Sequence, residues 1–222
     1  MIIESLQLGP IGTNGYIVGD EATGEAAVID PGGDAPLVLA ALADLGLTAT
    51  LIIATHAHFD HIGGVRDLVA VTGAPFLLHE AEVPILQVAA ERALLYFGIS
   101  VPPPPAPDRL LRAGEILMLG GAPFRVVHTP GHSPGHMCLI GDGVAFVGDV
   151  VFQGSIGRTD LPGGDYETLM RSIATHILTL PDDTVLYNGH GPSTTVGAER
   201  RTNPFLVGLG GGERPGGQAG ER

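Results

Sequence analysis

The sequence predicts an α/β fold, in which short buried strands alternate with helices. Several apolar runs of four or five residues are rich in branched aliphatic side chains, which is typical of buried strands. Longer segments between them carry apolar residues at helical spacing. Several of the strand-like runs are followed by His or Asp, so the same pattern places potential metal ligands at strand ends.

The first predicted elements are a hairpin, a helix and a strand. Residues 16–18 and 26–29 are expected to pair across the turn 19–24, and residues 30–33 end this hairpin. Residues 36–45 have helical spacing, with Asp34 as the expected cap and Gly46 as the stop. The apolar run 51–54 then predicts a buried strand.

The later elements continue this alternation. Strands are expected at 76–78, 124–127, 144–148 and 184–187, and helices at 63–69, 80–97 and 166–178, with Pro84 interrupting the second of these helices. Residues 102–105 predict a polyproline connection on the surface, with candidate ligands on both sides of it. We therefore expect one domain over residues 1–207 and a Gly-rich disordered tail over residues 208–222.

Composition restricts the class of protein. The chain has 222 residues, of which 44% are hydrophobic, enough for one domain with a sizeable core. All 11 basic residues are arginine and the net charge is −13, which excludes lysine chemistry and disfavours nucleic acid as a partner. We find no membrane-length apolar stretch and no signal peptide. The single Cys138, expected to be buried in a strand, fits a cytoplasmic protein.

The most specific motif is a loop directly after the strand 51–54, which contains His56, His58, Asp60 and His61. A loop at a strand end can aim several imidazoles at one point, and imidazole with carboxylate suits Zn, Fe, Cu or Ni. Asp60 could instead cap the helix 63–69, a role that competes for the same oxygens. Three histidines in one short loop have no structural need, so the loop predicts a metal site.

Three further candidate ligands, His132, Asp149 and His190, each follow another strand-like run. Because strands of a sheet end along a common edge, ligands at their ends can converge despite long gaps in sequence. Neighbouring glycines, Gly131, Gly148 and Gly189, are expected to let the backbone turn tightly there. All seven candidate ligands are therefore expected in one cleft.

The order H-x-H-x-D-H, then His, Asp and His, resembles the metallo-β-lactamase superfamily over about residues 14–205. The resemblance implies an αββα sandwich of two mixed β-sheets flanked by helices, with a two-metal site at one edge. Within the superfamily the chain looks most like single-domain hydroxyacylglutathione hydrolases of the glyoxalase II type. The stretches 148–152, 154–160, 189–192 and 199–205 carry that likeness.

Carried over residue by residue, the resemblance implies that one ion is held by His56, His58 and His132, the second by Asp60, His61 and His190, and that Asp149 bridges them. Asp60 and Asp149 then have catalytic as well as ligand roles. The expected ions are two zinc ions, with iron or manganese as alternatives. A pair about 3.5–4 Å apart binds one hydroxide and polarises a carbonyl. The implied enzyme is a thioester hydrolase whose nucleophile is this metal-bridging hydroxide.

The implied substrate is a small-molecule thioester or ester such as S-lactoylglutathione. Persulfide dioxygenases also resemble this chain in length, in the stretch 157–160 and in the stretch 199–204. They use one iron held by two histidines and a carboxylate, here His56, His132 and Asp149. The stretch 189–192 and the absence of cysteine in 154–156 favour the hydrolase.

Four residues near the ligands have two possible roles each. His128 and His136 either orient a ligand or substrate or are satisfied by backbone. Arg158 either holds a substrate carboxylate or pins Asp160, and we favour the second role. Tyr16 is predicted to be a core aromatic residue whose hydroxyl could face the cleft.

Overall fold

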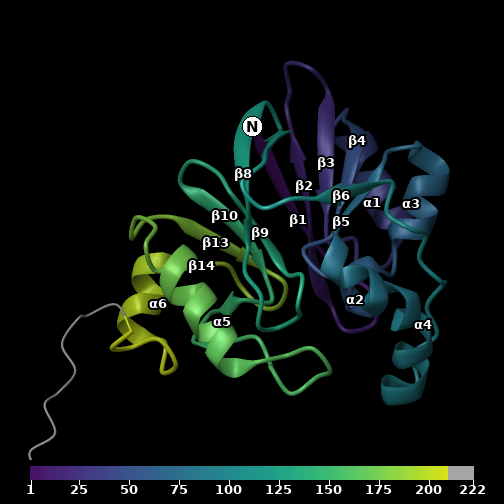
Figure 1. Cartoon of the computed structure of the whole chain (residues 1–222). Coiled ribbons are helices and arrows are strands. Elements are labelled where there is room, and N and C mark those ends of the chain that lie inside the picture. Colours follow the sequence, from purple (N-terminus) through teal and green to yellow (C-terminus); the bar gives the residue numbers. More distant parts are fainter. Residues whose placement is uncertain (210–222) are drawn as a thin grey trace, which may run out of the picture.

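The computed structural model describes residues 1–209 and shows two β-sheets packed face to face between two helical layers (Figure 1). This confirms the predicted αββα sandwich. The expected tail, 208–222, lies outside the described residues except for Gly208 and Leu209, which are exposed. Within residues 1–209, no helix has the length and apolarity needed to cross a bilayer.

The first sheet has six strands in sequence order, with helices on its outer face. Its strands are β1 (Ile2–Leu8), β2 (Thr13–Gly19), β3 (Glu25–Ile29), β4 (Thr48–Ile53), β5 (Phe76–His79) and β6 (Arg109–Leu111). The pairs β1–β2 and β2–β3 are antiparallel, and β3 to β6 pair in parallel. Parallel neighbours need crossovers, supplied by α1 (Ala35–Asp44), α2 (Phe59–Ile62), α3 (Val65–Thr72), η1 (Glu80–Glu82) and α4 (Val83–Phe97).

The second sheet also has six strands and is mostly antiparallel. Its order is β14 (Thr194–Thr195), β13 (Val185–Asn188), β10 (Val144–Gly148), β9 (Met137–Ile140), β8 (Ala122–His128) and β7 (Ile116–Leu119). Only β10 and β13 pair in parallel, joined through α5 (Tyr166–Ser172) and η2 (Ile173–Ile177). A small hairpin, β11 (Val151–Phe152) with β12 (Ser155–Ile156), precedes α5, and α6 (Val196–Thr202) follows β14.

Alternating side chains of the first sheet enter two different cores. Ile17 and Ile52 pack with the helices α1, α3 and α4, whereas their neighbours Val18 and Ile53 pack between the sheets. A third apolar cluster lies between the second sheet and α5 with η2. Because side chains on both faces of these strands are buried, several of the central strands contain short continuous apolar runs in the sequence.

Most predicted elements are present, and three details were wrong. The hairpin forms, with Tyr16 paired to Ile29. Asp34 does not cap α1: it is left-handed, with φ of 45°, and its carboxylate accepts a hydrogen bond from the Gly9 N–H at 2.9 Å. Pro84 does not interrupt a helix but lies in the first turn of α4, where its missing N–H costs nothing. The helix predicted over 166–178 widens into a π-turn at residues 173–177.

Candidate metal centre

The ends of four strands bring all seven predicted ligands to one edge of the sandwich. His56, His58, Asp60 and His61 follow β4, and His132 follows β8. Asp149 directly follows β10, and His190 comes two residues after β13. The side chains form two groups of three, which are linked by an overlapping set, His56, His61 and Asp149. Within each of these three sets the potential ligand atoms lie within 4.8 Å of one another.

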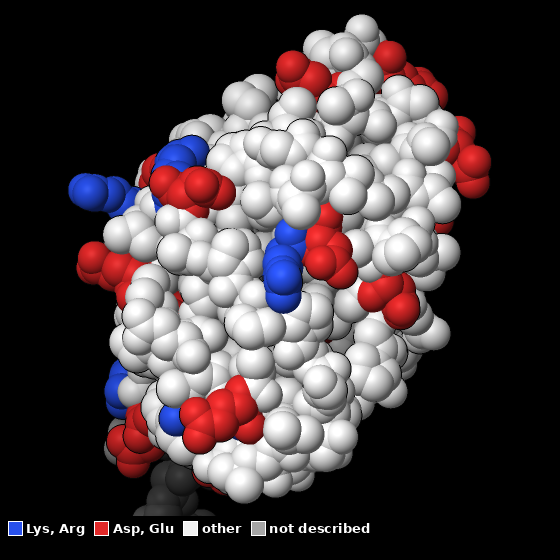
Figure 2. Space-filling view, turned by 90° about the vertical axis from the view of Figure 1, so that its right-hand side faces the viewer, with Lys and Arg blue, Asp and Glu red and all other residues white. Residues whose placement is uncertain are grey.

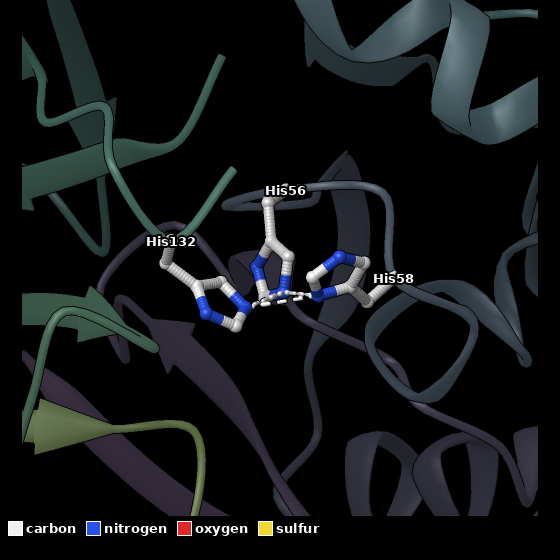
Figure 3. Close-up of side chains that lie close together, drawn as sticks. All are labelled: His56, His58 and His132. Atoms are coloured by element: carbon white, nitrogen blue, oxygen red, sulfur yellow. Dashed lines mark hydrogen bonds between the residues drawn. The ribbon is translucent and has the colours of Figure 1, made fainter. Parts of the chain in front are cut away.

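The first group consists of His56, His58 and His132, whose rings converge on one point (Figure 3). Nε2 of His56 is 3.0 Å from Nδ1 of His58, and Nε2 of His132 is 3.2 Å and 2.9 Å from these two atoms. Nitrogens bound to one tetrahedral zinc ion are roughly 3.3 Å apart, which follows from a Zn–N distance of about 2.0–2.1 Å. The spacing is therefore close to that of three ligands around one cation.

The second group consists of Asp60, His61 and His190. Oδ2 of Asp60 is 3.4 Å from Nε2 of His61 and 3.2 Å from Nε2 of His190. Asp149 lies between the groups: its Oδ1 is 3.3 Å from Nε2 of His61, and its Oδ2 is 3.5 Å from Nε2 of His132. One carboxylate therefore reaches both groups.

The residues present fit divalent metal ions. Nε2 of His61 and Oδ1 of Asp149 are buried, and among the described residues neither has a hydrogen-bond partner. Buried polar atoms are rarely left without a partner, and a cation between them would satisfy both. Five imidazoles and two carboxylates also form a donor set typical of Zn, Fe or Mn.

The two groups differ in their protonation. Burial and the neighbouring His132 lower the pKa of the His58 imidazole to about 3, and burial likewise lowers the pKa of His56 well below its usual value. Burial lowers the pKa of His190, but the carboxylates of Asp149 and Asp60, which accept hydrogen bonds from its ring, outweigh this and raise the pKa to about 9. The first pair of imidazoles is therefore neutral and ready to ligate, whereas His190 must release a proton to bind a metal.

Glu82 ties two of the ligand loops together, a role that sequence reasoning missed. Its fully buried carboxylate accepts hydrogen bonds from the Ala57 N–H at 2.8 Å and from the Gly135 N–H at 2.6 Å. Ala57 lies between His56 and His58 in sequence, and Gly135 belongs to the loop that carries His132, the third histidine of the first group. One side chain therefore fixes the spacing of these loops.

Asp30 and Thr13 support the second group and were also missed. Asp30 accepts hydrogen bonds from the N–H and hydroxyl of Thr55, and its Oδ2 lies 3.0 Å from Nδ1 of His61. The Thr13 hydroxyl donates to Oδ2 of Asp60 at 3.0 Å. Asp30 directly follows β3, so the pattern of a polar residue after a strand could have identified it.

The open roles of His136 and Tyr16 are decided by their hydrogen bonds. Nε2 of the buried His136 accepts a bond from the Asp149 N–H at 3.1 Å, so this imidazole orients the backbone of a predicted ligand. Burial and nearby His132 lower its pKa. Tyr16 is a buried core residue whose hydroxyl donates to the Asn188 carbonyl at 2.6 Å, so it does not face the cleft.

The remaining neighbours have structural contacts. His128 donates through Nε2 to the Pro134 carbonyl at 2.9 Å. The Arg158 side chain binds Asp160 with two hydrogen bonds of 2.7 and 2.8 Å, which is the role we favoured. Cys138 is buried on β9, and burial raises the pKa of its thiol to about 12.

The three glycines beside the ligands serve two different purposes. Gly131 and Gly148 have positive φ angles of 133° and 46°, as the predicted tight turns require. Gly189 does not, but a Cβ there would lie 2.1 Å from Oδ1 of Asp149. It is needed for the close approach of β13 to the candidate ligands.

A cleft of about 390 Å³ opens over both groups. Five of the candidate ligands line it: His58, Asp60, His132, Asp149 and His190. Its opposite wall is formed by α4 together with residues of β11, β12 and the segment 158–162. The arrangement can hold a small molecule against bound cations.

Comparison with known proteins gives consistent results. A family model described as the metallo-beta-lactamase superfamily matches residues 8–190. A relative named hydroxyacylglutathione hydrolase GloC, from Haemophilus influenzae, is 40% identical over 93% of this chain and 98% of its own length. Among solved structures, the BLEG-1 B3 metallo-beta-lactamase is 42% identical with a TM-score of 0.87, covering 93% of this chain and 100% of that one. TTHA1623 in a di-iron-bound form is 41% identical with a TM-score of 0.85, covering 91% and 100%.

Proposed function

The chain belongs to the metallo-beta-lactamase superfamily, and this membership supports a metal-dependent hydrolase. From this premise we propose that the protein hydrolyses a thioester at two divalent ions. The observation that carries this proposal is the complete second group, Asp60, His61 and His190, with Asp149 between it and the first group. The proposed site thus has a full set of donors for each ion.

The second group favours hydrolysis over oxygen chemistry. A mononuclear iron dioxygenase of the kind suggested by sequence would use His56, His132 and Asp149. It would have no use for Asp60, His61 and His190, which nevertheless lie within contact distance of one another. The charge and burial of a second ion position are consistent with a binuclear hydrolase.

Each part of the chain has a defined task in the proposed reaction. Two ions held by these residues would supply a water that is deprotonated near neutral pH and would polarise the carbonyl of the substrate. Asp149 provides the counter-charge shared by both positions, and Asp60 supplies the only other carboxylate among the seven ligands. A thiol leaving group has a pKa of about 8.5, so it departs without a strong general acid. The cleft needs only to orient the thioester.

The relatives support the finer points of the proposal. The name of the Haemophilus influenzae relative supports a hydroxyacylglutathione thioester such as S-lactoylglutathione as substrate. Zinc suits the donor set, and the di-iron form of TTHA1623 supports iron as the alternative. The proposed partner is a small molecule rather than nucleic acid or membrane, and the lone buried Cys138 is consistent with a cytoplasmic enzyme.

The decisive experiment measures thioester and oxygen together. Purified protein, loaded with zinc or with iron and with the ions counted per chain, is given S-lactoylglutathione, glutathione persulfide or a chromogenic cephalosporin. We expect two ions per chain and loss of thioester absorbance without oxygen uptake. Oxygen uptake with the persulfide and no thioester loss would replace this function with a dioxygenase, and cephalosporin cleavage alone would indicate a lactamase.

A further inference from the structure

One stripe of helix α4 forms a wall of the cleft. Ile85, Ala89, Arg92 and Tyr96 all line it, at spacings of four, three and four residues. Such spacing places side chains on one face of a helix, and at 1.5 Å per residue the stripe extends about 16 Å. It begins at the buried Ile85 and ends at Tyr96, which is 57% exposed. The wall therefore leads from the protein interior to solvent.

The cleft is apolar outside the candidate ligands. Apart from those ligands and Arg92, Arg158 and Ser155, its lining side chains are all aliphatic, aromatic or proline, among them Ile11, Phe59, Phe97, Phe152 and Leu161. Phe97 packs against Phe59 and is still 47% exposed. Charged side chains are sparse over much of the neighbouring face of the molecule (Figure 2). Exposed apolar surface of this kind is typical of a binding groove.

The two arginines of the cleft differ in their partners. Arg158 is engaged by both carboxylate oxygens of Asp160. The guanidinium of the half-buried Arg92 makes no hydrogen bond or ion pair to side chain or backbone within residues 1–209. A free guanidinium beside an apolar wall is suited to bind a carboxylate through two parallel hydrogen bonds. Arg92 is thus the basic group of the cleft that is available to a ligand.

We propose that the substrate is an amphipathic thioester, with an apolar segment lying along α4 and an anionic group bound by Arg92. This inference rests on the proposed hydrolase and names its substrate class. Arg92 is a specificity-determining residue, separated from Ile85 by about two helical turns. The reaction remains simple hydrolysis: oxygen from water is added to the acyl carbon, the carbon–sulfur bond breaks, and the thiol and carboxylic acid leave.

The test uses thioesters that differ only at one end. Phenylacetyl thioesters of 3-mercaptopropionate and of 3-mercaptopropionamide are nearly equal in shape, but only the first is anionic. Hydrogen bonds to a charged group predict that the wild-type protein prefers the carboxylate by about tenfold in kcat/KM, mainly through KM. Arg92→Gln should reduce this ratio to about one, and Arg92→Lys should retain part of it. The matched control Arg158→Gln should keep the wild-type ratio.

Two further measurements separate this inference from the proposed function. The acetyl thioester of 3-mercaptopropionate should be a poorer substrate than the phenylacetyl one by about tenfold or more, because it lacks the apolar segment. Calorimetric binding of the corresponding uncleavable thioethers should show the same carboxylate preference, lost in Arg92→Gln. Equal hydrolysis of all three thioesters would overturn the inference and leave the hydrolase intact. Charge-selective binding without any hydrolysis would uphold Arg92 and overturn the proposed function.

Discussion

The two ligand groups are built on opposite plans. Both groups combine residues that follow strands of both sheets, but the first group, His56, His58 and His132, contains only imidazoles. The second contains a carboxylate, Asp60, adjacent in sequence to His61, and the buried Asp30 lies directly behind it. The first position therefore has no carboxylate in its group, whereas the second has accumulated negative charge.

This difference locates the weak point of each group. The loops of the first group are joined by one side chain, Glu82, through two backbone N–H groups. The second group has several separate supports, among them Asp30, Thr13 and the close approach at Gly189. Asp149 is a carboxylate that contacts both groups. Substitutions at shared, first-group and second-group positions should then have separable effects.

The largest effect is expected from Asp149→Ala, because it removes the carboxylate that both groups share. Two close cations would lose their common counter-charge, so we expect fewer than one retained ion per chain and a loss of turnover above about 100-fold. Metal analysis after dialysis and a thioester assay measure both quantities. His58→Ala and His190→Ala, as controls, should each be less damaging. Two retained ions with near-normal turnover would contradict the bridging role.

Glu82→Ala should impair the first group selectively. The change leaves the buried N–H groups of Ala57 and Gly135 without acceptors, at about 1–3 kcal/mol each in the free energy of unfolding. Loss of ligand orientation typically weakens metal binding by about 10–100-fold. Denaturant unfolding of the metal-free protein and graded removal of metal by a chelator measure the two effects.

The exposed Glu80, on the same short helix η1, provides the matched control for Glu82. Glu80→Ala should change neither unfolding nor metal content, and Glu82→Gln should be intermediate because one acceptor oxygen remains. If Glu82→Ala weakened both ions equally, the proposed independence of the two groups would be wrong.

Tyr16→Phe should have the smallest effect, confined to the strand that carries the second group. It removes a hydrogen bond to the Asn188 carbonyl, which still accepts one from the Asn14 amide at 3.1 Å. We expect a loss of about 1 kcal/mol in the free energy of unfolding and no change in metal content. Tyr187→Phe is the control, since no hydrogen bond of that hydroxyl is found within residues 1–209. Loss of an ion from Tyr16→Phe would show that the second group is less robust than its contacts indicate.

Central strands were predictable from sequence, and edge strands were not. β10 and the second half of β4 are largely buried, so each contains a continuous apolar run. β1 is an edge strand with Glu4, Ser5 and Gln7 among its seven residues. β6 and β7 are short edge strands: two of the three residues of β6 are exposed, and exposed and buried residues alternate along β7. A pattern search for apolar runs does not identify such strands. The face-to-face packing of the sheets was expected only from the family resemblance.

The candidate ligands were predictable because their signal is local. Their spacing in the loop after β4, and the position of the other three after strands, are visible in the sequence. Glu82 carries no such signal: a glutamate within a predicted helix is usually solvated, and its burial depends on two distant loops folding over it. Asp34 shows the reverse error, since its local capping pattern is overridden by a hydrogen bond from a residue 25 positions away.

The glycines around the ligands determine where the protein can be varied. A Cβ at Gly32 or Gly157 would lie 1.9 Å from the carbonyl oxygen of Asp60 or Asp149 respectively, and one at Gly189 would lie 2.1 Å from the Asp149 carboxylate. Real Cβ atoms do not approach so closely, so any substitution at these positions must displace the backbone or the carboxylate of a candidate ligand. Directed evolution toward new substrates would find its tolerated mutations along α4, where side chains border open space.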